Sequence, residues 1–256
     1  MDLTQKMGLT DVRYIKEGKI AHVTLNRPDK LNAYTNQTLI ELSKCWVDYE
    51  SDDKLQVAIL SGAGAAFSVG HDLYSGESIT TEPPAIHYGD IKLYKPIIAA
   101  VHGYALGGGC SMALACDVLI CSEDAKFGYP QPKVGITTIG GPQRLPRLIP
   151  GLARWYLLSG EFITATEAYR LCLVLKVVPN DKLMEEANIL AQKLCECSSN
   201  SIRYIKEAIE EGKELPLRQA LYLSKLVTRK AEATEDYQDS LIAFKEKREP
   251  RWKKVP

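Results

Sequence analysis

The sequence lacks an excess of charge of either sign, and it lacks a long apolar run. Lysine and arginine together number 32, as do aspartate and glutamate, so no overall field attracts nucleic acid or an acidic membrane surface. No apolar run approaches the length of a membrane-spanning helix, and the first ten residues are polar, unlike a signal peptide. We therefore expect a soluble, cytoplasmic protein without a nucleic-acid or membrane partner.

Cysteine is present in an odd number, seven in 256 residues, and without the spacing of a metal site. Cys110, Cys116 and Cys121 lie in apolar runs, and Cys195 and Cys197 fall on different faces of an expected helix. We expect free thiols in a reducing compartment and no bound metal. A chain of this length is within the range of one large domain.

Apolar runs alternate with helical patterns along the chain, as in α/β proteins. Continuous apolar runs at residues 57–60, 97–101 and 118–121 are typical of parallel strands buried on both faces, and residues 19–26 predict a further strand. Residues 38–49 have apolar side chains at helical spacing, after a cap at Thr35 or Asn36. Further helices are predicted at residues 181–197, 201–212 and, as one or two helices, 217–248.

Three consecutive glycines, Gly107 to Gly109, follow a strand-like run and lead into a helical stretch. Glycine lets a ligand approach the main chain, and the first N–H groups of a helix have no partner within the helix and carry partial positive charge. The arrangement suits an oxygen that gains negative charge, although a tight strand-to-helix turn would need the same glycines.

A second glycine, Gly70, lies in the segment 67–73, which follows another strand-like run. A helix is expected to start after it, with Asp72 as a structural cap. Two backbone N–H groups from separate segments, converging on one oxygen, would form an oxyanion hole.

At this point the sequence resembles the crotonase superfamily, also called the enoyl-CoA hydratase/isomerase family, over nearly its whole length. The matching motifs occur in order at residues 25–33 (LNRPDKLNA), 67–73 (FSVGHDL), 103–117, 127–135 and 244–248 (FKEKR). The resemblance implies an α/β fold, the crotonase (ClpP-like) spiral of repeated β-β-α units, over residues 1–195, with a C-terminal helical region at 196–256. It also implies an acyl-CoA substrate that carries the only coenzyme, and assembly as a homotrimer or a dimer of trimers.

The resemblance further implies that the thioester carbonyl lies between the backbone N–H groups of His71 and Gly108. The His71 ring either bonds a substrate carboxylate or hydroxyl, or only packs. Residues implied in binding the substrate and coenzyme A are Lys30, Leu31, Ala66, Ser68 and Gly70, together with Phe244 and Lys247, which could come from a neighbouring subunit.

The sequence departs from the family where the catalytic acids are expected. Hydratases of the family use two glutamates to activate water, and Ser111 and Gln131 stand at those positions. Isomerases place an acid at the second position or after Gly135, where residues 136–139 carry none. Some decarboxylases of the superfamily have a histidine where His71 stands, but their aromatic hydroxyl would match Thr138 or its neighbours.

Three interpretations remain. The favoured one is a lyase reaction, such as decarboxylation of a malonyl-type thioester, which needs an oxyanion hole but no base. The second is a hydratase or isomerase with an acid relocated to Asp72, Glu77 or elsewhere in the polar segment 74–94, which is expected to cover the substrate. The third is an acyl-CoA-binding or assembly subunit without catalytic activity.

Overall fold

The computed structural model describes residues 1–78, 85–86 and 90–254, and a six-stranded sheet forms its centre. Strand order across the sheet is β1-β2-β3-β4-β6-β9, and all neighbours are parallel except β1 and β2, which form an antiparallel hairpin. The strands are β1 (Val12–Glu17), β2 (Ile20–Leu25), β3 (Val57–Gly62), β4 (Ile97–Val101), β6 (Val118–Ser122) and β9 (Lys176–Val178).

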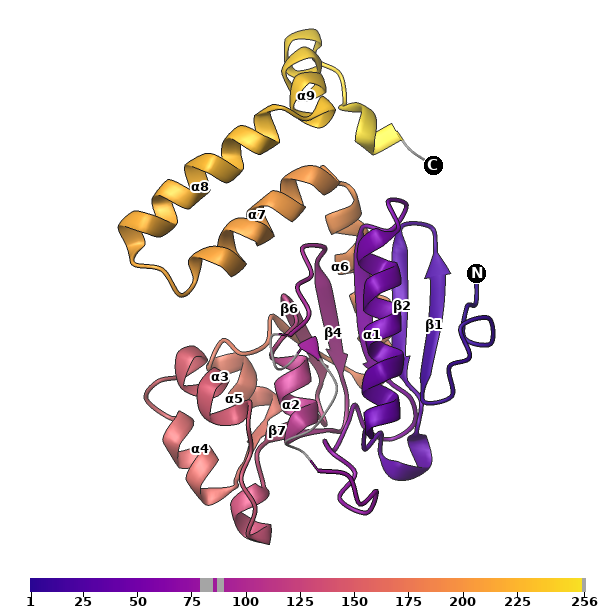
Figure 1. The fold of residues 1–256 in the computed structure, drawn as a ribbon, viewed down its shortest axis with the longest axis vertical. Helices are drawn as coiled ribbons and strands as arrows, with labels where there is room; N and C mark the ends of the chain where they lie inside the picture. Colours follow the sequence, from indigo (N-terminus) through magenta and orange to yellow (C-terminus); the bar gives the residue numbers. More distant parts are fainter. Residues whose placement is uncertain (79–84, 87–89, 255–256) are drawn as a thin grey trace.

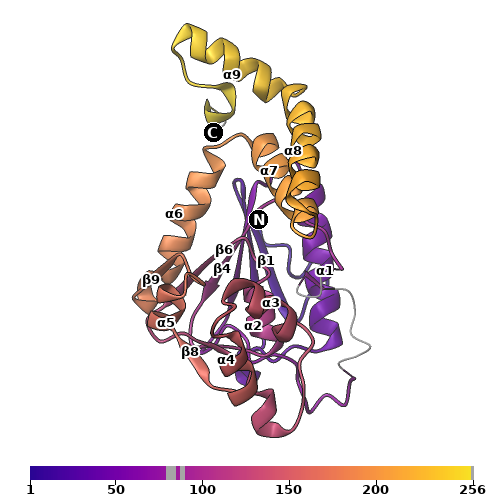
Figure 2. The ribbon, with the colours of Figure 1, turned by 90° about the vertical axis from the view of Figure 1, so that its left-hand side faces the viewer.

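Both faces of this sheet are covered, as the continuous apolar runs predict. In β3, Ala58 and Leu60 belong to the core that includes residues of α1 (Asn36–Ser51), whereas Val57 and Ile59 pack in a second core with α6 (Leu183–Cys195). Figure 2 shows the sheet between these two helices. The helix α1 begins after Thr35, whose side chain accepts a hydrogen bond from the N–H of Thr38.

A second, three-stranded sheet, which the sequence did not predict, carries the glycine-rich turn. It consists of β5 (Tyr104–Leu106), β7 (Lys126–Gly128) and β8 (Phe162–Thr164), and β5 runs directly into α2 (Gly108–Ala113). Two isolated bridges, Ser68 with Ala105 and Tyr34 with His71, extend the pairing to the first glycine segment. Strands of three residues are too short for their periodicity to be recognised in a sequence.

The remaining helices form two groups. In the first are α3 (Gly141–Leu148), α4 (Ala153–Ser159) and α5 (Ala165–Arg170), with the 3₁₀ turn η3 (Gln131–Val134) against α4. Two other 3₁₀ turns lie apart from it, η1 (Pro28–Lys30) after β2 and η4 (Asn180–Lys182) before α6. The second group follows α6 and consists of α7 (Ser199–Gly212), α8 (Leu217–Glu232), α9 (Glu235–Glu246) and the turn η5 (Arg251–Lys254).

The second group extends past one end of the sheet, with α8 alongside α7 and α9 beyond them (Figure 1). It is joined to the core through α7, where the Lys206 ammonium pairs with Asp117 at 2.7 Å and donates to the carbonyl of Lys95. Among the helices that the structure describes, none has the length and apolar character needed to cross a membrane.

Candidate active site

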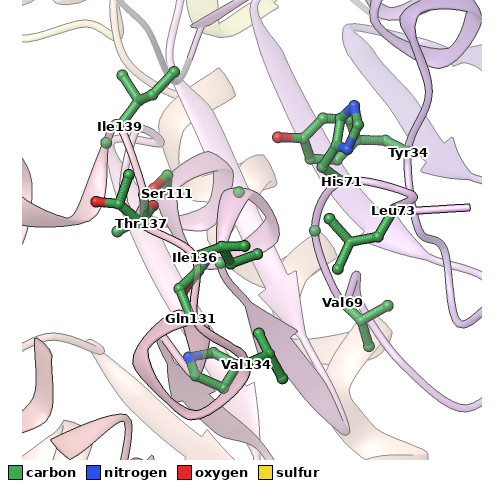
Figure 3. A pocket seen from close by; sticks show the side chains of 16 residues that line it. Tyr34, Val69, His71, Leu73, Ser111, Gln131, Val134, Ile136, Thr137 and Ile139 are labelled. Carbon is green, nitrogen blue, oxygen red and sulfur yellow. The ribbon is translucent and has the colours of Figure 1, made fainter. Parts of the chain in front are cut away.

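A cavity of about 120 Å³ lies where the two glycine segments meet. Its lining comes from Tyr34, from residues 69–73, from the start of α2 and from the segment 130–140. Figure 3 shows the side chains of Tyr34 and His71 on one side of this cavity, facing Ser111, Gln131 and Thr137 on the other.

The two glycine segments are in direct contact. A Cβ on Gly70 would lie 2.8 Å from the carbonyl oxygen of Leu106 and 3.1 Å from the backbone nitrogen of Gly108, and the φ of Gly70 is +94°. The contact is held by two hydrogen bonds of 2.9 Å, from the N–H of Ser68 to Tyr104 and from the N–H of Leu106 to Ser68. The predicted convergence of the two segments is therefore present in the fold.

The bridge to Tyr34 orients the backbone of His71. The N–H of Tyr34 donates to Gly70 at 2.8 Å, and the N–H of Asp72 donates to Tyr34 at 2.8 Å. In a parallel bridge, the residue between the two bonded neighbours points its own N–H to the opposite side. The N–H of His71 therefore points away from Tyr34, and the neighbouring Gly70 lies against Leu106 and Gly108.

Gly108 is the first residue of α2 and follows the N-cap residue Gly107. The first hydrogen bond within this helix runs from the N–H of Ser111 to the carbonyl of Gly107, so the N–H of Gly108 has no acceptor in its own helix. A Cβ on Gly108 would overlap the Tyr34 hydroxyl and lie 2.7 Å from the ring carbon Cζ, which restricts this position to glycine.

The His71 ring is kept neutral by its surroundings. Burial lowers its pKa below the usual value of 6.5, against the opposing effect of the carboxylates of Glu77 and Asp72. The ring meets that of Tyr34 edge-on, with the centroids 5.8 Å apart. An uncharged imidazole at neutral pH can both donate and accept a hydrogen bond.

Ser111 and Gln131 differ in what their polar groups face. The hydroxyl oxygen of Ser111 lies 3.0 Å from that of Tyr129, in a fully buried pair. The Gln131 amide lies against Gly107, where a Cβ would be 2.5 Å from Nε2. Its Oε1 is buried and has no hydrogen-bond partner among the residues that the structure describes. An acceptor is thus available at the wall of the cavity.

The segment after Gly135 closes another side of the cavity. Thr137 and Thr138 line it together with Ile136 and Ile139, and Thr138 is half-buried. This wall offers hydroxyl groups and apolar surface without a charge.

The acids next to the first glycine segment have structural partners. Residues 71–78 form turns and contain no helix, so the prediction that Asp72 caps one there is wrong, and its carboxylate lies 3.2 Å from a guanidinium nitrogen of Arg27. The carboxylate of Glu77 accepts from the N–H of Asn36 at the start of α1, at 2.8 Å. The predicted substrate cover at 74–94 falls partly outside the described residues.

The residues expected to bind coenzyme A are distributed more widely. Lys30 and Leu31 are exposed at the end of η1, whereas Ala66 and Ser68 are fully buried. The N–H and carbonyl of Ser68 are hydrogen-bonded to Tyr104 and Leu106. Its main chain therefore holds the two segments together and does not face the cavity as a binding group.

The expected tail residues are remote from the cavity in this chain. The Phe244 side chain is 88% exposed on α9, and Lys247 follows that helix, at the opposite end of the molecule from the glycine segments (Figures 1 and 2).

Sequence reasoning missed Tyr34, which lines the cavity but lies one residue beyond the 25–33 motif. Its side chain belongs to no periodic or charge pattern that points to a site. The only signal was a polar aromatic group directly after that motif.

Comparison with known proteins decides the family. The model of the enoyl-CoA hydratase/isomerase family matches residues 15–255. The chain belongs to this family. Its recognition from the sequence motifs is therefore confirmed, and the protein is an acyl-CoA enzyme of the enoyl-CoA hydratase/isomerase family.

Relatives of this family match almost end to end. The short-chain-enoyl-CoA hydratase of Clostridium acetobutylicum is 38% identical, over 94% of this chain and 97% of its own. The (E)-benzylidenesuccinyl-CoA hydratase of Thauera aromatica is 37% identical, over 91% of this chain and 95% of its own.

The fold is shared with solved members of the enoyl-CoA hydratase/isomerase family. The crystal structure of an enoyl-CoA hydratase from Mycobacterium marinum matches with a TM-score of 0.89 and 31% identity, over 96% of this chain and 99% of that one. The predicted α/β crotonase fold with a C-terminal helical region is therefore confirmed.

Proposed function

We propose that this enzyme stabilises a thioester enolate between the backbone N–H groups of His71 and Gly108, and that its reaction is the decarboxylation of a malonyl-type acyl-CoA. One observation carries the proposal: among the described residues that line the cavity there is no carboxylate. A substrate that brings its own leaving group needs no base to form the enolate.

The chemistry is balanced with one proton from water as the only other reactant. The bond between Cα and the carboxylate carbon breaks, CO₂ leaves, and the electron pair moves through Cα to the thioester oxygen as an enolate. Cα then takes up one proton to give the shorter acyl-CoA. The two N–H groups act on the oxygen where charge develops, and removing one such donor typically costs about 10²- to 10³-fold in rate.

The rest of the lining suits this substrate. The neutral His71 ring, the Gln131 Oε1 and the hydroxyls of Thr137 and Thr138 are uncharged groups that orient a polar acyl portion. Apolar side chains of Val69, Leu73, Val134, Ile136 and Ile139 lie among them. A substrate carboxylate is destabilised when it moves from water into such a cavity, whereas the neutral CO₂ formed from it is not.

Hydration of an enoyl-CoA is the second candidate, because relatives at 37–38% identity are named hydratases. Water addition requires a group that activates water, and general acid–base catalysis is worth about 10²- to 10⁴-fold. Ser111 and Gln131 do not titrate near neutral pH. An acid that does not line the cavity in this structure, such as Glu77, or one outside the described residues would have to supply this function.

One experiment separates these reactions. The purified protein is incubated with methylmalonyl-CoA and, separately, with crotonyl-CoA, and the products are identified by mass. Loss of CO₂ from the first without hydration of the second is the expected result. Hydration of crotonyl-CoA alone would overturn the proposal in favour of the second candidate.

A binding measurement covers the third interpretation. If neither thioester is turned over while both raise the melting temperature, the protein binds acyl-CoA without catalysing a reaction. A Gly108→Pro variant, which lacks the backbone N–H, should lose turnover and serves as the inactive control.

We also propose that the chain assembles into trimers through its C-terminal helices. Their exposed apolar side chains support self-association, and Leu217, Tyr222 and Phe244 are 74%, 65% and 88% exposed. Assembly would also bring Phe244 and Lys247 near a neighbouring site. Sedimentation should give a multiple of three chains, and a monomer would contradict the proposal.

A further inference from the structure

We propose that the Tyr34 hydroxyl is a third donor to the thioester oxygen, which makes Tyr34 a catalytic residue. The inference rests on the oxyanion stabilisation proposed above and extends it from two backbone donors to a side chain.

The backbone of Tyr34 is fixed to the first of the two oxyanion segments. Its N–H and carbonyl are bonded on either side of His71, at 2.8 Å to Gly70 and 2.8 Å from Asp72. The residue is 1% exposed, and its ring meets the His71 ring edge-on. Because backbone and ring are both held, the side chain has little freedom to point elsewhere.

The other end of the Tyr34 side chain reaches the second segment. Its hydroxyl occupies the space where a Cβ of Gly108 would stand, directly beside the backbone that carries the second N–H. The tyrosine therefore spans from one predicted donor residue to the other, and Figure 3 shows its hydroxyl pointing across the cavity. An oxygen bound between His71 and Gly108 comes within reach of that hydroxyl.

The hydroxyls of three other buried tyrosines belong to residues that do not line the cavity. Those of Tyr14, Tyr49 and Tyr129 lie 2.7 Å from Asp48, 2.7 Å from the carbonyl of Pro96 and 3.0 Å from the Ser111 hydroxyl. Tyr34 differs because it lines the cavity itself. A tyrosine hydroxyl can donate one hydrogen bond, and a donor aimed at a developing enolate favours the transition state over the neutral substrate.

The test compares Tyr34→Phe with Tyr49→Phe. Phenylalanine keeps the buried ring of Tyr34, so the melting temperature of the first variant should stay near that of the parent. Its kcat on the malonyl-type thioester should fall about 10- to 10³-fold with little change in KM. The Tyr49 variant loses a hydrogen bond in the core and should be less stable but equally active.

Binding of two coenzyme A analogues separates catalysis from structure. A nitronate analogue carries enolate-like charge on its oxygens, whereas a thioether analogue has a methylene in place of the carbonyl. Tyr34→Phe should weaken the Kd for the nitronate by the same factor as it lowers kcat, and leave the Kd for the thioether unchanged.

The outcomes also separate this inference from the proposed reaction. Weaker nitronate binding in a protein that decarboxylates nothing would retain the third donor and reject decarboxylation. Unchanged nitronate affinity in Tyr34→Phe, with decarboxylation intact, would overturn the third donor and retain the reaction. Equal weakening of both analogues would also overturn it, because the loss would then be structural.

Discussion

The hydroxyl oxygens of Ser111 and Tyr129 lie 3.0 Å apart in a fully buried pair that joins α2 to the end of β7. The Tyr129 ring in turn packs on Gly141, where a Cβ would lie 2.6 Å from Cε1, and so reaches the start of α3. A position at which hydratases of the family carry a glutamate is here part of the packing around the site. Its hydroxyl is bonded to another side chain.

Replacing Ser111 by alanine should affect stability more than activity. The Tyr129 hydroxyl would lose one of its two buried partners and keep the Cys110 thiol, which we expect to cost about 1 kcal/mol in the free energy of unfolding. The rate should change by less than about threefold, because a lone hydroxyl supplies none of the acid–base catalysis of a glutamate. Denaturant unfolding and steady-state kinetics measure the two effects, and a hundredfold loss of kcat would show that Ser111 takes part in the chemistry.

Replacing Gly108 by alanine should abolish turnover. The added Cβ overlaps the Tyr34 hydroxyl, so either the tyrosine or the start of α2 must move. A shift of the Gly108 N–H removes an oxyanion donor, with an expected loss of at least about 10²-fold in kcat. Gly151→Ala is the matched control, because a Cβ there meets nothing within 4 Å. Full activity in Gly108→Ala would rule out this backbone as a donor.

Replacing Glu77 by glutamine tests whether this acid has taken over the lost catalytic role. Its carboxylate accepts from the N–H of Asn36, where the positive end of α1 favours a negative charge. We expect a loss of about 0.5–1 kcal/mol in stability and unchanged activity. Glu185→Gln, in an exposed pair with Lys182, controls for loss of charge. A selective hundredfold loss of enoyl-CoA hydration in Glu77→Gln would instead support a relocated acid.

The His71 ring should titrate below its usual pKa of 6.5. Because the unfolded chain then binds more protons than the folded one, the contribution of His71 to stability is complete above pH 6.5. It is lost as the pH falls through the lowered folded-state pKa. NMR titration of the imidazole, assigned by comparison with His71→Gln, measures this directly. A midpoint at or above 6.5 would contradict a neutral ring at pH 7.

Replacing Cys172 by glycine should stabilise the protein. Cys172 has a φ of +57°, in the left-handed region that favours glycine. A side chain in this region destabilises the folded state by about 1–2 kcal/mol. Replacing it by glycine removes this strain, but glycine loses more conformational entropy on folding, which offsets part of the gain. We expect a net gain of about 0.5–1 kcal/mol and a rise of about 1–4 °C in Tm. Cys172→Ala should show no gain, and a lower Tm for the glycine variant would contradict the argument.

The sequence by itself determined that the central strands are buried on both faces and that the site lacks the two glutamates of the family's hydratases. The run Val57 to Leu60 must be buried on both faces because it has no polar side chain to turn toward water, and the structure packs it between α1 and α6. Ser111 and Gln131 are identified from their positions in the motifs alone, and neither side chain contains a carboxylate in any fold. The helix expected after Gly70 is absent from residues 71–78, where Asp72 pairs with Arg27, a partner distant in the sequence.

Only the tertiary structure decided which groups meet at the cavity. Periodicity and caps report interactions within a few residues, whereas the approach of Tyr34 to Gly108 depends on the bridge to His71 and on β5 pairing with Ser68. The same pairing brings Gly70 against Gly108. The sequence therefore specified two glycine turns and the absence of the usual acids, and the hydrogen bonds between distant segments placed a tyrosine hydroxyl between those turns.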